Sequence, residues 1–399
     1  MKIILLKLFV ILAFAIFLYG CSESTNTNSS PKRLVYYYYS DSSAIGWDNY
    51  FVLYSYNLNT GDTKKVTNNT IVHTTGVAQN GNIVFDCGMF TEPGCWLVNS
   101  SGVAMPMPMP VSTIPSFQYI LAMAPEIQLS NDGSTAVFFL IYENSNDGSV
   151  AGTRLVYFNF LTMNCTMIDL SNYLKFVFND SAINYCDVSG HYMVLKNGNS
   201  KLWFVVSGFN KNGNNYNFIA SRVCEFSNNR IYNISRVENS SLEIIGADLP
   251  NERIFVSKLN PNDTLNHSYY IFAADNNNDS IPVNIPSENF SNPEQFAKEK
   301  SEMAGWTDNG IAIYDLNTMT VSQDVISWSR IDSLYPGLTH EKNSRLSFSP
   351  DGEYITFALP SADGIYGTDL LIIKRDGTEF KRILHGTAIG IPVISDVIQ

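Results

Sequence analysis

The segment DNNNDS has the residue types and spacing of a calcium-binding loop. Asp275, Asn277 and Asp279 place side-chain oxygens at alternate positions, as the first half of such a loop does. Ser280, however, stands where the loop needs glycine, and Pro286 occupies the twelfth position, which should supply a bidentate carboxylate. We therefore favour a polar connection between strands and keep the three residues as a weak calcium candidate.

The remaining polar residues form no recognisable catalytic motif. The sequence has no Gly-x-Ser-x-Gly elbow and no glycine-rich phosphate loop. It also lacks the Cys-x-x-Cys and His-x-x-x-His spacings of structural zinc sites. The five histidines are scattered: His73, His191, His267, His340 and His385. We therefore predict no catalytic residues, no cofactor and no enzymatic activity.

Two of the six cysteines flank a segment with the composition of a hairpin connection. Cys87 and Cys95 enclose GMFTEPG, and a disulfide across such a hairpin would suit an oxidising compartment. Two small buried residues at strand ends explain the same pattern, so both interpretations stay open. The pairing of Cys165, Cys186 and Cys224 is not assigned by the sequence.

The N-terminal residues resemble a bacterial lipoprotein signal. Lys2 and Lys7 precede an apolar run of twelve residues, 8–19, which is too short to span a bilayer as a stable helix. The following LYGC resembles the lipobox, which implies cleavage after Gly20 and lipidation of Cys21. An ordinary signal peptide, or a cytosolic protein with an apolar start, is the alternative.

We expect three regions: a signal peptide at 1–20, a polar tether at 21–31 and a folded domain at 32–399. The tether contains no apolar residue after Cys21 and cannot bury surface. By resemblance to enterobacterial lipoproteins, Ser22 favours the outer membrane, facing either the periplasm or the cell surface. The expected location is therefore the bacterial cell envelope, with the membrane bound through a lipid anchor.

The composition favours strands and excludes nucleic acid as a partner. Aromatic residues make up 13% of the 399-residue chain, and they prefer strands, while the abundant Asn and Gly prefer the turns between them. The net charge of −12 repels phosphate backbones. The length suits one large all-β domain.

The segment SFSPDGEYITFALPSADGIYGTDLLIIKRDGTEF predicts strand, turn, strand, loop, strand, turn. Asp351 and Gly352 supply the first turn, because glycine tolerates positive φ. Ile355, Phe357 and Leu359 then share one face of a strand. The next strand, DLLIIK, is apolar on both faces, as expected between two neighbouring sheets.

Similar segments recur along the chain and predict a ring. IQLSNDGSTAVFFLIY matches well, VAQNGNIVFDC and EIIGADLPNERIFVSKL match more weakly, and GWTDNGIAIYDL is abbreviated. The expected units start near residues 33, 77, 128, 185, 243, 302 and 346. The first unit lacks a first strand, and the C-terminal GTAIGIPVISDVIQ resembles one. We therefore expect the C-terminal strand to complete the N-terminal sheet.

The repeat resembles that of TolB-like β-propellers, above all in FSPDGEYITFA and DLLIIKRDGTEFKRIL. The resemblance implies an all-β fold: one propeller of six or seven four-stranded blades, with seven favoured over the merger of the abbreviated unit. A pair of β-sandwiches is the alternative fold.

A tethered propeller is expected to be a non-catalytic binding or scaffold module, with a protein as its partner. One alternative is an enzyme acting on glycans or peptides, with its site in the central funnel. Another is a surface-exposed antigen or adhesin.

Overall fold

The fold is described here from a computed structural model of the chain. The described residues are 33–40, 51–66, 73–77, 83–87, 94–98, 104–106, 120–121, 128–130, 134–143, 150–174, 177–196, 199–213, 215–227, 230–260, 263–273, 281–283, 295–297, 299–342, 344–349, 351–361, 368–387 and 393–396. The signal peptide, the tether and Cys21 lie outside these residues and stay predictions. No helix in the described ranges is long and apolar enough to cross a membrane.

The described strands form seven antiparallel sheets, numbered here along the chain. Sheet 1 has the order β28 (Val393–Asp396), β1 (Arg33–Ser40), β2 (Phe51–Asn57) and β3 (Thr63–Lys65). Sheet 2 contains β4 (His73–Val77), β5 (Ile83–Cys87), β6 (Gly94–Val98) and β7 (Ala104–Pro106). Sheet 3 contains β8 (Ile120–Leu121), β9 (Gln128–Leu129), β10 (Thr135–Glu143), β11 (Val150–Asn159) and β12 (Asn164–Asp169).

The second half of the chain supplies the other four sheets and two short helices. Sheet 4 contains β13 (Tyr185–Lys196), β14 (Asn199–Asn212), β15 (Asn215–Ser227) and β16 (Arg230–Asn233). Sheet 5 contains β17 (Leu242–Asp248), β18 (Arg253–Asn260), β19 (Asp263–Ala273) and β20 (Ile281–Val283). Sheet 6 contains β21 (Glu302–Thr307), β22 (Gly310–Asp315) and β23 (Thr320–Ser327), and sheet 7 contains β24 (Leu346–Phe348), β25 (Tyr354–Pro360), β26 (Thr368–Lys374) and β27 (Lys381–Thr387). The helices are α2 (Ser171–Leu174) and α3 (Trp328–Leu334).

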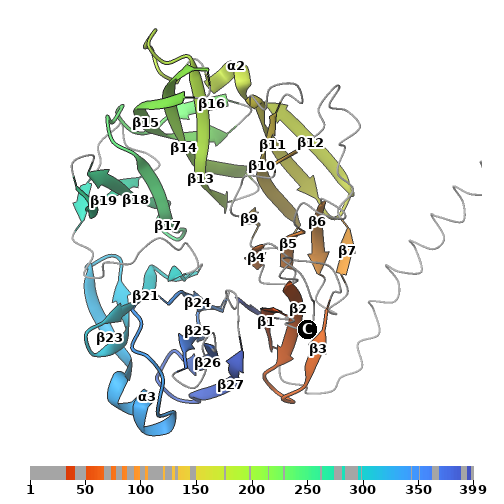
Figure 1. The fold of residues 1–399 in the computed structure, drawn as a ribbon, viewed down its shortest axis with the longest axis vertical. Coiled ribbons are helices and arrows are strands. Elements are labelled where there is room, and N and C mark those ends of the chain that lie inside the picture. The colour runs from red at the N-terminus through yellow and green to blue at the C-terminus, as the bar shows by residue number, and fades with distance from the viewer. Residues whose placement is uncertain are drawn as a thin grey trace, which may run out of the picture.

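The sheets follow one another around a common centre in a propeller-like arrangement (Figure 1). Strands at the centre contact their neighbours in ring order: β28 with β4, β4 with β9, β9 with β13, and β13 with β17. Further round, β21 contacts β24, and β24 contacts β28. This arrangement differs from a pair of β-sandwiches, because each sheet packs against two others.

The core lies between neighbouring sheets, which explains strands that are apolar on both faces. In β26, Leu371 and Ile373 pack against sheet 6, whereas Leu370 and Ile372 pack against sheet 1. In β14, Phe204 packs toward sheet 3, whereas Trp203 packs toward sheet 5. Successive side chains of a strand point to opposite faces, so a strand between two sheets is apolar throughout.

The C-terminal strand β28 pairs with β1, as the sequence predicts. The two strands are antiparallel, with Arg33 opposite Asp396 and Tyr36 opposite Val393. Strands from both ends of the described chain therefore share sheet 1.

Sheets 3 and 6 correct the prediction that every unit has four strands. In sheet 3, two short strands, β8 and β9, both pair with β10. In sheet 6, three strands are described from the predicted start near residue 302, and the described residues before β21 add one bridge, between Phe296 and Met303. The segment after it, AKEKS, is charged and poor in residues that favour strands.

Phe296 nevertheless holds its place in the core between sheets 5 and 6. Its ring is buried and packs on Phe255, with the ring centroids 5.1 Å apart. A Cβ atom built on Gly246 in β17 would lie 2.2 Å from this ring. Glycine at position 246 is therefore what allows sheet 6 to begin with Phe296.

Candidate functional site

The turns of the sheets lie at two opposite ends. Because consecutive strands are antiparallel, the turn between the second and third strands lies at one end of a sheet, and the other two turns lie at the opposite end. We call the end with two turns the tie face. At this end, polar side chains of one sheet contact those of the next. The residues that define the tie face are Arg33, Lys201, Asp248, Asn251, Glu252, Lys300, Ser301, Asp351 and Glu353.

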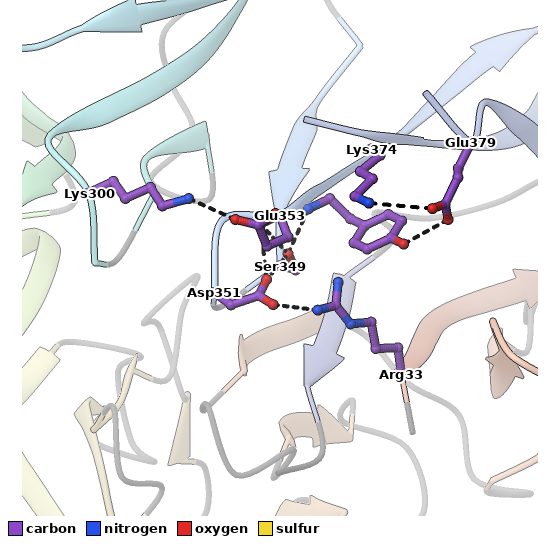
Figure 2. Close-up of polar contacts among 8 residues, drawn as sticks. Arg33, Lys300, Ser349, Asp351, Glu353, Lys374 and Glu379 are labelled. Atoms are coloured by element: carbon purple, nitrogen blue, oxygen red, sulfur yellow. Dashed lines mark hydrogen bonds and ion pairs between the residues drawn. The ribbon is translucent and has the colours of Figure 1, made fainter. Parts of the chain in front are cut away.

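At the tie face, Arg33 joins sheet 1 to sheet 7 (Figure 2). Its guanidinium lies 2.6 Å from Asp351 Oδ2, in the turn between β24 and β25, and 4.6 Å from the centroid of the Tyr354 ring. Ser349 fixes this turn, since its Oγ donates to Asp351 Oδ1 at 2.6 Å and accepts from the Tyr354 N–H at 2.9 Å. The Ser-Pro-Asp-Gly motif thus supplies a turn and an inter-sheet contact together.

Two further ion pairs join sheets 6 and 7 at the same face. Lys300 Nζ lies 3.0 Å from Glu353 Oε1, and both side chains point toward each other across the gap between the sheets (Figure 2). Arg375 pairs with Glu302 at the start of β21. Each ion pair places a cation from one sheet against a carboxylate from the next.

Asp248 is the most buried carboxylate of the tie face. It accepts hydrogen bonds from Arg253 Nε at 2.9 Å, Asn251 Nδ2 at 2.9 Å and Ser301 Oγ at 3.0 Å. Its side chain has no exposed surface. Because Ser301 belongs to the turn before β21, the carboxylate joins sheets 5 and 6, and Lys201 joins sheets 4 and 5 through Glu252 at 3.4 Å.

Tyr354 lies next to this network, with its hydroxyl bonded to a carboxylate. Burial raises its pKa to about 12, and the hydrogen bond from its hydroxyl to Glu379 Oε2 at 2.8 Å acts in the same direction. The phenol is therefore protonated at neutral pH. The carboxylates around it are neutralised by cations, as in a structural network rather than an acid/base pair.

One histidine is held by a buried carboxylate in sheet 7. His385 Nδ1 lies 2.8 Å from Asp369 Oδ1, and Arg382 Nη1 lies 3.0 Å from Asp369 Oδ2. A carboxylate and a histidine that it orients in this way supply two of the three members of a catalytic triad. Within the described ranges, no serine, threonine or cysteine side chain forms a hydrogen bond to His385.

His340 has a packing role. Its ring stacks on Trp328 at 4.4 Å, and Trp328 stacks on Trp306 at 4.7 Å. Its Nε2 lies 2.8 Å from Asp332 Oδ1. The other histidines, His73, His191 and His267, lie on β4, β13 and β19, and their side chains are not among those described.

The predicted calcium loop and the predicted disulfide stay untested. Asp275, Asn277 and Asp279 lie outside the described residues. Cys87 and Cys95 lie on paired strands, with Cys87 opposite Gly94 and Cys95 opposite Asp86, so the two are one position out of register. In the part of the chain that the structure describes, no three His, Cys, Asp or Glu residues gather in a way that would hold a metal ion.

The three remaining cysteines are free: Cys165, Cys186 and Cys224. Burial raises the pKa of Cys224 to about 12 and that of Cys186 to about 11. Their thiols are therefore protonated at neutral pH and poorly nucleophilic.

The opposite end of sheet 4 carries an aromatic cluster that the sequence analysis missed. Tyr185, Phe209 and Phe218 occupy one row across β13, β14 and β15. Tyr216 packs edge-to-face on Tyr185 at 5.1 Å, and the Lys211 ammonium lies 4.8 Å from the Tyr216 ring centroid. Tyr216 and Phe218 remain 42% and 37% exposed. The alternation of aromatic and polar residues in FNKNGNNYNF is the signal that would have predicted this cluster.

Comparison with known proteins assigns no family. No protein-family model and no curated protein matches the chain. Solved structures that align with it include an acylaminoacyl peptidase (10% identity, TM-score 0.49, 89% of this chain and 52% of that one) and a putative TolB from Agrobacterium tumefaciens (8% identity, TM-score 0.34, 93% and 100%). A quinonprotein alcohol dehydrogenase-like protein from Bacteroides thetaiotaomicron also aligns (10% identity, TM-score 0.43, 90% and 76%). This chain spans about half the length of the peptidase, and at such low similarity no activity carries over.

Proposed function

We propose that this protein is a lipid-anchored component of the bacterial envelope whose seven sheets are the blades of a closed, TolB-like β-propeller. In this proposal the propeller is a non-catalytic binding or scaffold module for a protein partner. The observation that carries the proposal is the series of polar contacts at the tie face, which join sheets 4 to 5, 5 to 6, 6 to 7 and 7 to 1. They favour a rigid disc, and each carboxylate of the series is paired with a cation or a hydrogen-bond donor.

The pairing of β28 with β1 supports closure of the ring. It adds a central strand to sheet 1 from the far end of the chain, and β28 also contacts β4 and β24 on either side. An open array would instead leave an unpaired edge at each end.

The proposed lipid anchor is connected to the propeller at the tie face. Arg33 begins β1 at the tie face and follows the lipidated Cys21 by twelve positions. A chain of that length reaches at most roughly 40 Å when fully extended, and about 20 Å on average as a flexible coil. The tether is therefore attached at the tie face, and the opposite face, with the aromatic cluster, is left free of the attachment point for a partner.

The experiment that tests this function is crosslinking of the lipidated protein in its native cells, followed by affinity recovery. A Cys21→Ala variant, which cannot be lipidated, is the control. The proposal predicts one dominant envelope protein in repeated recoveries with the wild type and its loss or depletion with the variant. The absence of a reproducible partner would contradict the binding function and leave the enzyme alternative to be tested.

Exposure of whole cells to protease separates the remaining alternatives. A periplasmic scaffold stays intact until the outer membrane is permeabilised. A surface antigen or adhesin is cleaved on intact cells.

A further inference from the structure

The β14–β15 hairpin is longer than the strands of the next sheet. β14 has 14 residues and β15 has 13, whereas β17 and β18 of sheet 5 have seven and eight. The end of the hairpin is therefore exposed on both faces: Asn215, Tyr216, Asn217 and Phe218 are four consecutive exposed residues. A strand segment exposed on both faces makes little contribution to a core.

The outer edge of β15 has no pairing strand at this end in the part of the chain that the structure describes. β16 pairs with β15 only from Cys224 to Ser227, and the segment after β16 forms one bridge, between Glu238 and Ser221. Among the described residues, no strand pairs with the outer edge of β15 between Asn215 and Ala220. The unpaired N–H and C=O groups of such an edge are a template for another strand.

Proteins often protect exposed edges with lysine, proline, charged residues or β-bulges. This edge has no lysine, proline or charged residue between positions 215 and 220, and its pairing with β14 is irregular between Gly208 and Phe209. Its sequence from residue 215 to 220 is NYNFIA. The exposed Tyr216 and Phe218 share one face with Lys211, while Asn215 and Asn217 share the other with their cross-strand partners Asn212 and Asn210. An incoming strand would thus meet aromatic rings on one face and amides on the other.

We propose that this edge binds an extended segment of the protein partner as an added β-strand. The segment alternates apolar residues, which pack beside Tyr216 and Phe218, with polar residues, which face the asparagine side chains. Main-chain hydrogen bonds hold the segment, and the aromatic rings select its alternate side chains. This inference rests on the proposed function and names the surface that performs it.

The test is a selection of nine-residue peptides from a display library on the full-length, lipidated protein in detergent. Each selected peptide is then remade with N-methyl groups on alternate amides, which removes backbone donors and keeps every side chain. The proposal predicts alternating apolar and polar peptides whose affinity falls at least tenfold on N-methylation. It also predicts slower hydrogen exchange in residues 215–220 when the unmodified peptide is bound.

Two matched variants locate the binding surface. Phe218→Lys places a charge beside the edge and should weaken the peptides at least tenfold, while Tyr232→Lys makes the same change at an exposed aromatic residue on β16 and should not. Equal affinity for both N-methylated and unmodified peptides, or for Phe218→Lys and the wild type, would overturn the proposal. A selection that yields no extended peptides would also overturn it. So would a dimer in sedimentation that dissociates in Phe218→Lys, because the occupant of the edge would then be a second copy of the chain.

Failure of this inference is distinguishable from failure of the proposed function. If Phe218→Lys still recovers the same partner from native cells, the edge is not the binding surface and the scaffold function stands. If the wild type recovers no partner, the scaffold function itself fails.

Discussion

The tie face and the hairpin end of sheet 4 use polar groups in opposite ways. At the tie face, Asp248, Asp351 and Glu353 each accept a contact from a neighbouring sheet or turn. At the hairpin end, the backbone edge of residues 215–220 faces no strand among the described residues, and aromatic rings stay exposed beside it. The first arrangement joins neighbouring sheets to one another, whereas the second leaves backbone groups to which the proposed partner would bind. Changes at the tie face should therefore affect stability, and changes at the hairpin end should affect binding.

The largest expected effect is that of Asp248→Ala. Removing this buried carboxylate leaves Arg253, Asn251 and Ser301 without a shared acceptor, and we expect a loss of about 3–5 kcal/mol in the free energy of unfolding. Denaturant unfolding followed by fluorescence measures it. Lys342→Ala, which removes an exposed ion pair with Asp308, is the control and should leave the midpoint unchanged. Equal midpoints for the two variants would contradict a structural role for the tie face.

A second stability effect is expected at Gly246. An alanine there would drive its methyl group into the Phe296 ring, and overpacking of this kind costs about 1–3 kcal/mol. Gly246→Ala is best measured in a double-mutant cycle with Phe296→Leu, which makes space for the methyl group. The second substitution should recover part of the loss. If the two effects simply add, the ring is not what requires glycine at this position.

The hydroxyl of Tyr354 should make the free energy of unfolding depend on pH in the alkaline range. Its pKa of about 12 in the folded protein exceeds the value of 10.0 for an unperturbed tyrosine. The contribution of the protonated Tyr354 hydroxyl to the free energy of unfolding is therefore complete below pH 10. It is lost as the pH rises toward 12, because the unfolded state releases the proton first. The free energy of unfolding of Tyr354→Phe should fall less steeply across that window than that of the wild type. Tyr232→Phe, which changes an exposed tyrosine of sheet 4, should keep the wild-type slope.

The smallest expected effect concerns the reactivity of Cys224, which lies in the interior of sheet 4, away from the exposed hairpin end. Cys224 is fully buried, and burial raises its pKa, so it should resist alkylation at pH 8 in the folded protein. Mass spectrometry of alkylated peptides measures this, and the same data show whether Cys87 and Cys95 form a disulfide. Rapid labelling of Cys224 without denaturant would mean that sheet 4 opens as a whole, and the exposed hairpin end would then reflect local instability rather than a binding surface.

The sequence predicted the parts of the fold that depend on local patterns. Alternating apolar residues and glycine-containing turns placed unit starts near residues 128, 185 and 346, where β9, β13 and β24 begin. The first unit's missing strand predicted the pairing of β28 with β1. Sheet 6 was recognised in the sequence as an abbreviated unit, but the bridge between Phe296 and Met303 that precedes β21 was not predicted. No local pattern reveals such a bridge, since it depends on the space that Gly246 leaves in another sheet.

The candidate sites likewise combine features that local sequence patterns predict with features that depend on contacts between sheets. The Ser-Pro-Asp-Gly turn was visible in the sequence, but its partner Arg33 lies more than 300 positions away and was not. The aromatic residues of the β14–β15 hairpin were also visible, yet their exposure depends on the shorter strands of sheet 5. To predict a contact between two sheets, one must know which sheets are neighbours. This order follows only from the assembled fold.

The most direct test of the account compares two variants in one experiment, the recovery of crosslinked partner from native cells. Arg33→Ala removes a contact of the tie face, and Phe218→Lys changes the edge of β15. The account predicts that Arg33→Ala lowers the stability of the protein by about 1 kcal/mol and still recovers the partner, whereas Phe218→Lys stays folded and loses the partner. Loss of the partner in Arg33→Ala together with its full recovery in Phe218→Lys would contradict the account.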